Sequence, residues 1–363
     1  MKKILIIFLA LIWIFPPLVY SQDANVTAAG MQFLEGSWSD VLATAKEQNK
    51  YIFVDAFADW CVPCKWMVKN VFSTEEAGKY YNENFISYKL DMEKGEGIDF
   101  AKKYDVSVYP SYLYFNPSGE LVHRSVGSKS VEMFIEDGKN ALNPDKQFSA
   151  MQKKYESGER SAGFLYDYAF ALSNANADPK LVNEAAIIYL GTQKEEDYVN
   201  EKNWKLINEL LTDINSAPFK YIDANRSKFE AKYGEKEVAL KIDYTKIQYY
   251  MYTEKWDEYA KVTSVFADKF AKDNSGMLNE FAWSFYEHVK DKAMLKKASK
   301  WAKKSMELEK NYYNTDTYAA LLYKLGKNEQ AIKYAKEAIE LAKKSGINYG
   351  ETEALLKKIE AEE

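Results

Sequence analysis

Two cysteines, Cys61 and Cys64, stand between an apolar run and a segment typical of a helix start, and they are the only cysteines in the 363 residues. Residues 51–58 have the length and composition of a buried strand, and residues 65–69 continue as a helix. A CxxC pair at a strand-to-helix junction is typical of redox-active thiols. Without a third cysteine, the pair can react only within itself or with a sulfur atom of another molecule.

Such a pair of cysteines could instead form a structural disulfide or bind zinc. A disulfide that closes a four-residue loop constrains the unfolded chain very little, so it would add little stability. Structural zinc needs four ligands, whereas the chain offers two cysteines and two histidines, His123 and His288. We therefore expect no metal and no cofactor, and we expect both histidines to be surface or packing residues.

Residues 1–21 have the layout of a secretory signal peptide. Lys2 and Lys3 precede an apolar run over residues 4–14, which two prolines and a small residue then follow. The run is short for a membrane span, although an uncleaved anchor is the alternative. The sequence predicts a cleaved bacterial signal peptide, a periplasmic destination and a linker over residues 22–30.

The charge balance argues against nucleic-acid binding. When the two lysines of residues 1–21 are set aside, 47 basic and 54 acidic residues remain, a net charge of −7. Binding to nucleic acids in general needs a basic face, so we expect no nucleic-acid partner. The interspersed charges favour solubility.

Composition changes near Asn143 and Pro144, which predicts two domains in the mature chain. Residues 31–142 alternate between strands and helices, which predicts a mixed central sheet flanked by helices. Residues 143–363 are predicted to be helical throughout. The elements predicted in the first domain are a helix over 39–48, a strand over 51–58, helices over 63–71 and 75–82, a strand over 85–90, a helix over 98–104, strands over 111–115 and 120–125, and a helix over 130–141.

The end of the helical region repeats itself. Residues 298–308 are matched 33 positions later by residues 331–341, and both copies begin with alanine and end with Glu-Leu. A helix-turn-helix unit of about 34 residues with small residues between paired helices is the pattern of tetratricopeptide (TPR) repeats. The sequence therefore predicts a TPR-like helical-repeat domain, whose tyrosines we expect to pack between helices.

Two motifs give residues 31–142 a resemblance to a known family. One is Val54-Asp-Ala-Phe-Ala-Asp-Trp-Cys-Val-Pro-Cys-Lys65, and the other is Val108-Tyr-Pro-Ser111, which begins 44 residues after the second cysteine. These residues resemble the thioredoxin superfamily, and above all its periplasmic modules, including the C-terminal domain of DsbD-type electron-transfer proteins. The chain departs from thioredoxin itself at Val62, Phe57 and Lys69, where a glycine, a tryptophan and a proline are usual, which leaves the substrate range and redox potential open.

The resemblance implies a set of catalytic roles. Cys61, at the N-terminus of a helix that favours its thiolate, would attack a disulfide, and Cys64 would resolve the mixed disulfide. Asp55 matches the buried acid of the family and Lys89 matches its neighbouring lysine. A carboxylate buried there should have a raised pKa and could exchange a proton with Cys64.

The resemblance also implies residues that bind the substrate. Pro110 would follow a cis peptide bond, face the CxxC motif and expose the backbone of Tyr109 to an extended client segment. Gly127 matches the small residue that lets a partner's backbone approach, and Trp60 would border the reactive cysteine.

Two functions of different classes fit these residues. The first is an exported thiol–disulfide oxidoreductase, favoured as a reductase because the CxxC dipeptide contains proline and no histidine. Its partners would be client proteins with disulfides, a membrane electron donor of DsbD type and a possible protein partner of the helical domain. The second is a non-enzymatic adaptor, scaffold or chaperone-like protein that acts through the helical domain, which the intact CxxC argues against.

Overall fold

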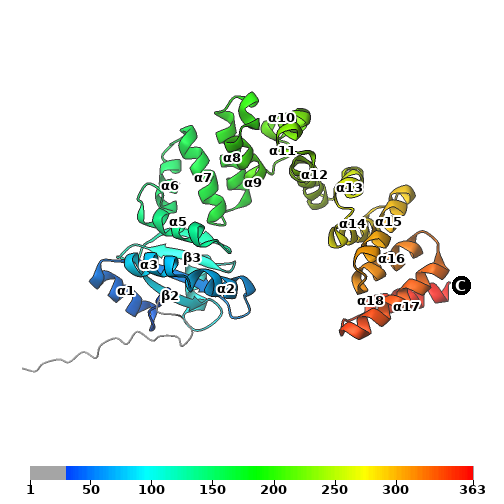
Figure 1. Cartoon of the computed structure of the whole chain (residues 1–363), viewed down its shortest axis with the longest axis horizontal. Coiled ribbons are helices and arrows are strands. Elements are labelled where there is room, and N and C mark those ends of the chain that lie inside the picture. Colours follow the sequence, from blue (N-terminus) through cyan, green and yellow to red (C-terminus); the bar gives the residue numbers. More distant parts are fainter. Residues whose placement is uncertain (1–29, 363) are drawn as a thin grey trace, which may run out of the picture. The chain divides into compact units, whose positions relative to one another are not determined.

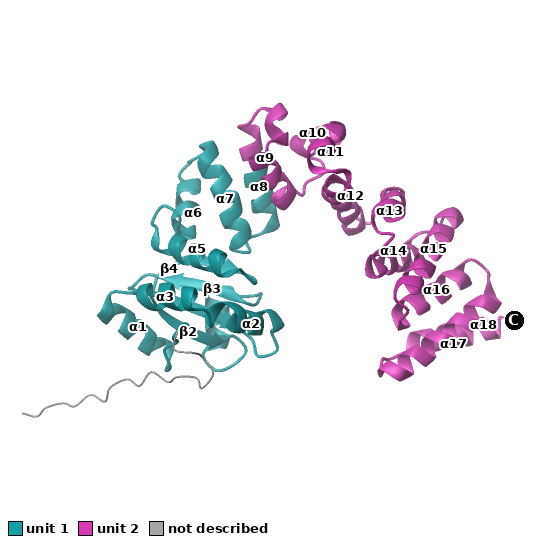
Figure 2. Ribbon diagram, in the orientation of Figure 1, with its two compact units in different colours: residues 1–186 teal, residues 187–363 magenta. Residues whose placement is uncertain are grey.

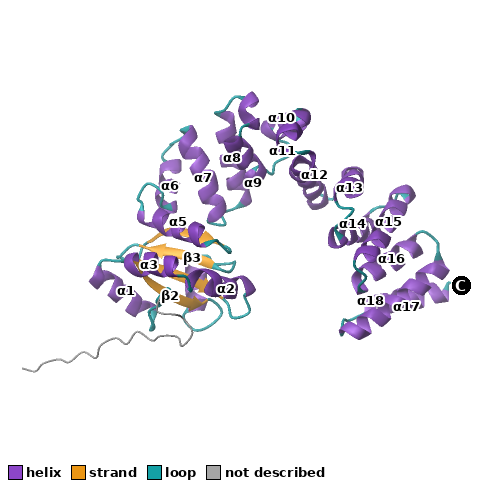
Figure 3. Cartoon of the chain, viewed as in Figure 1, coloured by secondary structure: helices purple, strands orange, loops and turns teal. Residues whose placement is uncertain are grey.

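The structure, a computed structural model, describes residues 30–362. The signal peptide predicted over residues 1–21 and nearly all of the predicted linker lie outside this range. Strands and helices alternate in the first part of the described chain, and the rest is helical (Figures 1 and 3). The predicted combination of a thioredoxin-like sheet domain and a large all-helical region is confirmed.

Four strands form one mixed sheet in the order β2-β1-β3-β4. Their bounds are Tyr51–Phe57 for β1, Phe85–Asp91 for β2, Ser111–Phe115 for β3 and Leu121–Val126 for β4. Strand β1 pairs in parallel with β2 and antiparallel with β3, and β3 pairs antiparallel with β4. Because β1 has a partner on each side, it lies inside the sheet, and the five residues between its ends are buried.

Helices pack on both faces of the sheet (Figure 1). Alternate residues of a strand point to opposite faces, so Phe53 enters a core with α2, α3 and α5, whereas Val54 enters a core with α1 and α4. A π-helical turn over Val68–Phe72 follows α2, where the sequence predicts one continuous helix. Such a turn places the consecutive residues Val71 and Phe72 both in the core. The helices are α1 Trp38–Gln48, α2 Val62–Met67, α3 Glu75–Asn84, α4 Gly97–Lys103 and α5 Val131–Leu142.

Tyr81 joins three elements of the sheet domain. Its hydroxyl donates to the backbone oxygen of Phe134 in α5 at 2.7 Å and lies 2.8 Å from the hydroxyl of Tyr114 in β3. The rings of Tyr81 and Phe134 stack with centroids 4.3 Å apart. All three residues are fully buried, so packing and hydrogen bonding together hold α3 and α5 on the same face.

The helical region follows without a strand between residue 143 and the end of the described chain. No helix in the described part is both long enough and apolar enough to cross a membrane. The elements are α6 Phe148–Glu156, α7 Ala162–Asn174, α8 Pro179–Gly191, the 3-10 helix η2 Glu195–Val199, α9 Glu201–Leu210, α10 Ala217–Ala224, α11 Arg226–Tyr233, α12 Glu235–Tyr252, α13 Trp256–Phe270, α14 Ser275–His288, α15 Lys292–Leu308, α16 Tyr312–Lys324, α17 Asn328–Ser345 and α18 Gly350–Ala361.

The chain divides into two compact units, residues 1–186 and residues 187–363 (Figure 2). In the first unit, α6 and α7 pack against β4, so the first helices of the helical region share a unit with the sheet. The domain boundary that the sequence suggests between residues 142 and 143 stays a prediction.

In the second unit, neighbouring helices pack as pairs, α14 with α15 and α16 with α17. Small buried residues, among them Ala298, Ala331 and Ala338, let the paired helices approach closely. Residues 325–327 separate α16 from α17. These features agree with helix-turn-helix units, and their assignment to TPR repeats stays a prediction.

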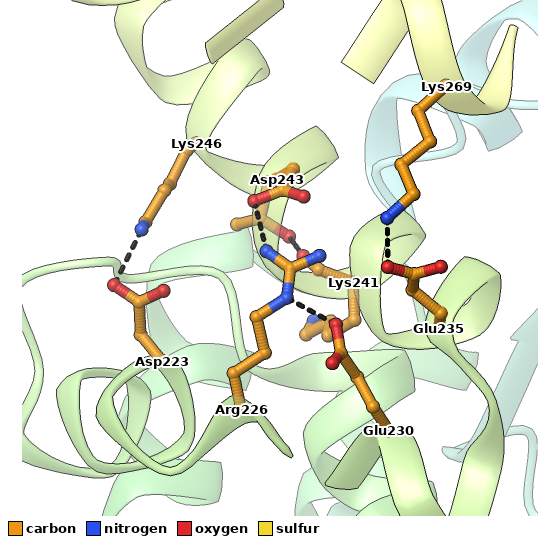
Figure 4. Close-up of polar contacts among 9 residues, drawn as sticks. Asp223, Arg226, Glu230, Glu235, Lys241, Asp243, Lys246 and Lys269 are labelled. Carbon is orange, nitrogen blue, oxygen red and sulfur yellow. Dashed lines mark hydrogen bonds and ion pairs between the residues drawn. The ribbon is translucent and has the colours of Figure 1, made fainter. Parts of the chain in front are cut away.

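Charged side chains connect α11, α12 and their neighbours in the second unit (Figure 4). Arg226 donates to Glu230 at 2.6 Å and to Asp243 at 2.8 Å. Lys241 is buried and donates to the backbone oxygen of Leu211, just after α9, and burial lowers its pKa to about 8. Lys241 thereby satisfies a carbonyl at a helix end that would otherwise be unpaired. The other ion pairs drawn are Lys246 with Asp223 and Lys269 with Glu235.

Gly138 in α5 tests the packing of α5 on α3. A Cβ atom there would lie 2.8 Å from a ring carbon of Tyr80 and 3.2 Å from the hydroxyl of Tyr81. Gly138→Ala should therefore lower the free energy of unfolding by about 1–3 kcal/mol, because overpacking outweighs the gain of about 1 kcal/mol in helix propensity. Urea unfolding checks this.

Gly163→Ala is the matched control, because a Cβ atom at this position in α7 meets nothing within 4 Å. It should leave the stability unchanged or raise it by up to about 1 kcal/mol. Equal effects of the two substitutions would contradict the close packing of α3 and α5.

Candidate active site

Cys61 and Cys64 form a disulfide at the start of α2. Cys61 is the N-cap residue, and its Sγ atom accepts a hydrogen bond from the backbone N–H of Cys64 at 3.1 Å. Pro63 lies in the first turn, where its missing N–H would have had no helical partner. The unpaired N–H groups of this helix end favour negative charge on Cys61 when the disulfide is reduced.

Neighbouring side chains cover the disulfide. Only 1% of Cys61 and 4% of Cys64 is exposed, and Phe57 and Tyr109 pack against them. Tyr109 lies 48 residues further along the chain than Cys61, so this cover forms only in the folded protein. A client sulfur can therefore reach Cys61 only after one of the covering groups moves.

Trp60 lies at the rim of this cover and is 66% exposed. Its ring centroid is 6.0 Å from that of Tyr109, and its Nε1 atom donates to the Glu93 carboxylate at 2.9 Å. Lys94 pairs with Asp59 beside the motif. The sequence analysis did not predict these contacts of Glu93 and Lys94. They form because the loop after β2 folds back toward the residues before the cysteines.

Pro110 follows a cis peptide bond, as predicted, and immediately precedes β3. Its backbone oxygen accepts a hydrogen bond from the N–H of Gly127 at 2.9 Å. Gly127 has a φ of +83°, which favours glycine, and a Cβ atom there would meet nothing within 4 Å. The structure thus brings Pro110 and Gly127 together, with open space beside the glycine.

Asp55 lies in β1 beneath the disulfide-bearing helix. The residue is 1% exposed, and its Oδ1 atom has no hydrogen-bond partner. Burial raises the pKa of Asp55 to about 7, and the positive charge of Lys89 opposes that rise. Lys89 is the register partner of Asp55 on β2, and its Nζ atom lies over the ring of Phe57 at 5.3 Å.

Each of the two histidines has packing or hydrogen-bond partners of its own. His123 in β4 is buried, its Nδ1 atom accepts a hydrogen bond from the backbone of Phe148, and burial lowers its pKa to about 4. His288 stacks on Trp256 in the second unit. Within residues 30–362, no group of three or more His, Cys, Asp or Glu side chains could hold a metal ion.

The raised pKa of Asp55 makes stability depend on pH. The folded protein binds this proton more tightly than the unfolded chain, so the free energy of unfolding should fall as pH rises from about 4 to about 7. Asp55→Asn should abolish this dependence and be more stable than the wild type above pH 7, by an amount on the order of 4 kcal/mol. Urea unfolding of the oxidised proteins at pH 5 and pH 8 measures it.

Asp99→Asn is the control, because Asp99 is an exposed residue of α4. Its unfolding free energy should follow that of the wild type at both pH values. Parallel curves for Asp55→Asn and the wild type would contradict the raised pKa.

Known proteins match the sheet domain. The sequence profile of the Thioredoxin_7 family, described as thioredoxin-like, matches residues 33–117. Thioredoxin H4 of Arabidopsis thaliana is 30% identical over 96 residues, which cover 26% of this chain and 76% of that protein. The thiol:disulfide interchange protein DsbD of Pseudomonas fluorescens is 28% identical over 102 residues, which cover 28% of this chain and only 17% of DsbD.

A solved structure also aligns with this part of the chain. It is the solution structure of a candidate disulphide-isomerase from Bacteroides thetaiotaomicron, which is 40% identical. The alignment covers 32% of this chain and 97% of that chain, with a TM-score of 0.30. From the sequence matches and the CxxC pair Cys61–Cys64 on a thioredoxin-like sheet, we conclude that the chain belongs to the thioredoxin family of thiol–disulfide oxidoreductases.

Proposed function

We propose that this protein is an exported reductase of protein disulfides. The observation that carries the proposal is the Cys61–Cys64 pair at a helix N-terminus, with Tyr109, which precedes the cis peptide bond of Pro110, packed against it. The strand that leads to this pair carries the buried Asp55. These are the groups that dithiol exchange needs: a stabilised thiolate, a second thiol one turn away and a proton acceptor with a pKa near neutral pH.

The reaction begins with the reduced dithiol. The Cys61 thiolate attacks a client disulfide, forms a mixed disulfide and releases the first client thiolate. Cys64 gives its proton to Asp55, with Lys89 nearby, and its sulfur attacks Sγ of Cys61. The Cys61–Cys64 disulfide forms, and the second client sulfur leaves with the electron pair. Two electrons pass to the client, whose two thiolates take up protons.

Client binding is proposed at the rim of the disulfide. An extended client segment would pair with the backbone at Tyr109, which the cis bond of Pro110 presents, and the open space beside Gly127 would admit its chain. The Trp60 side chain would contact the client after it rotates away from Tyr109. The mobility of this exposed side chain would let one site accept clients of different sequence.

The direction and location rest on other observations. Strong oxidants stabilise the reduced form by depressing the pKa of the attacking thiol, and the Val62-Pro63 dipeptide supplies no histidine for that purpose. A reductase outside the cytoplasm needs an electron donor, and the similarity to part of DsbD favours a membrane donor of that type. Export is proposed from the sequence of residues 1–21.

The helical region is proposed to select clients or partners. Helix pairs such as α14/α15 and α16/α17 form extended surfaces in repeat proteins. The sheet domain contains every residue proposed for the chemistry, so the helices are available for recognition. The two activities can then be separated by mutation.

A trapping experiment tests the roles of the two cysteines. Cys64→Ser should leave clients bound to Cys61 as mixed disulfides, because no second thiol releases them. Non-reducing electrophoresis of cell extracts detects these adducts, which should disappear on reduction. Cys61→Ser is the matched control and should form few of them; the reverse pattern would assign the attack to Cys64.

The reduction potential tests the direction. Equilibration with glutathione should give a value closer to about −270 mV, as in thioredoxin, than to about −120 mV, as in DsbA. A value at the DsbA end would make the protein an oxidase.

A further inference from the structure

A row of polar side chains crosses the sheet beneath the disulfide. Lys89 of β2 is the register partner of Asp55 in β1, Asp55 that of Tyr112 in β3, and Tyr112 that of Ser125 in β4. Direct register partners point to the same face of a sheet. Asp55, Tyr112 and Ser125 are all fully buried, so the row lies inside the core that α2 and α5 cover.

The row continues from the sheet to α5. Ser125 donates to Oδ2 of Asp137 at 2.7 Å, and Nζ of Lys129 lies 3.1 Å from the same oxygen. Lys129 and Asp137 are 6% and 7% exposed. The backbone N–H of Lys129 also lies 3.3 Å from Sδ of Met67, which is one turn after Cys64 in α2. A buried ion pair thus lies at one end of the row, next to the helix that carries the disulfide.

Two atoms in the middle of the row have no hydrogen-bond partner. They are Oδ1 of Asp55 and the hydroxyl of Tyr112, both buried. Asp137 already has donors in Ser125 and Lys129, whereas Oδ1 of Asp55 has none. Buried polar groups are rarely left unpaired. The two register partners of Asp55 are Lys89, whose Nζ atom lies over the rings of Phe33 and Phe57, and Tyr112, whose hydroxyl has no partner.

We propose that Tyr112 is a positioning residue of the exchange reaction: its hydroxyl donates a hydrogen bond, through one water molecule, to the Asp55 carboxylate that takes the proton of Cys64. This rests on the proposed role of Asp55. The thiol proton of Cys64 moves to Asp55, and Tyr112 keeps its own proton. The electron pair of the Cys64 thiolate forms the bond to Sγ of Cys61.

The other titratable groups around Asp55 do not compete with the Tyr112 hydroxyl as the donor to its carboxylate. Lys89 supplies a positive charge from β2. Of the titratable groups in α2, Cys64 is buried and Lys65 is exposed. Beyond Tyr112, Lys129 and Asp137 neutralise each other, and His123 beside them is neutral above about pH 5. Burial, and then the negative charges of Asp55 and Asp137, raise the pKa of Tyr112, so the phenol keeps its proton and remains a donor.

Tyr112→Phe removes the hydroxyl and keeps the ring in the core. Losing a donor to the charged form should raise the pKa of Asp55 by about one unit. Because the ionised carboxylate accepts the proton of Cys64, the pH profile of mixed-disulfide resolution should move upward by the same amount. At pH 6 the rate should fall by up to about tenfold, and it should recover above pH 8. Stopped-flow fluorescence over pH 5–9 measures it.

Tyr114→Phe is the matched control. Tyr114 lies two residues along β3 on the same face and is equally buried, but its hydroxyl bonds to Tyr81 instead. This variant should lose stability and keep the wild-type pH profile. An unmoved profile in Tyr112→Phe, or equal shifts in both variants, would overturn the proposal.

A direct titration separates this proposal from the role of Asp55. Carbon-13 NMR of the Asp55 carboxyl group in the reduced protein should show the higher pKa in Tyr112→Phe. An unchanged Asp55 pKa would overturn the link between the two residues. If Asp55→Asn instead keeps the wild-type rates and profile, the proposed role of Asp55 fails while the titration still decides whether Tyr112 acts on it.

Discussion

The pairing of β1 on both of its edges is the constraint on which the site depends. Parallel pairing with β2 and antiparallel pairing with β3 keep β1 in the interior of the sheet. The same pairing sets Lys89 and Tyr112 on either side of Asp55. It also determines where the chain leaves the sheet, so that Cys61 lies at the start of a helix packed back over the strand. Backbone hydrogen bonds thus set Lys89, Asp55 and Tyr112 side by side, with Asp55 in the strand that leads to the cysteines.

The face that receives Asp55 is otherwise aromatic and aliphatic. It includes the rings of Phe53, Phe72, Tyr112 and Phe134, whose centroids lie 5–7 Å from one another. Such surroundings favour a neutral carboxyl, and Lys89 restores part of the preference for charge. The balance puts the pKa near neutral pH, where a general base is most effective. Burial lowers the stability of the ionised protein and gives Asp55 the pKa that the proposed proton transfer requires.

The pattern of apolar and polar residues predicted most of the strands and helices, because this periodicity depends only on residues that are close in the sequence. Strands 51–58 and 111–115 were predicted within one residue of β1 and β3, and the resemblance pointed to Pro110 and its cis bond. Register between distant strands is not local. In the sequence, Tyr112 stands in a strand rich in aromatic residues, which suggests only a core residue. Its position beside Asp55 can be deduced only once β3 is known to pair with β1 and not with β2. The cover of Cys61 by Tyr109 was missed for the same reason.

The groups around the disulfide differ in how firmly they are held. Pro110, just before β3, and Gly127, just after β4, are joined by a backbone hydrogen bond. Trp60 is exposed and held by Glu93, a contact worth about 1 kcal/mol in water. Displacing Trp60 therefore costs little compared with moving the strand. Access to Cys61 also needs Phe57 or Tyr109 to move, whereas Asp55, Lys89 and Tyr112 are held by the register of the sheet.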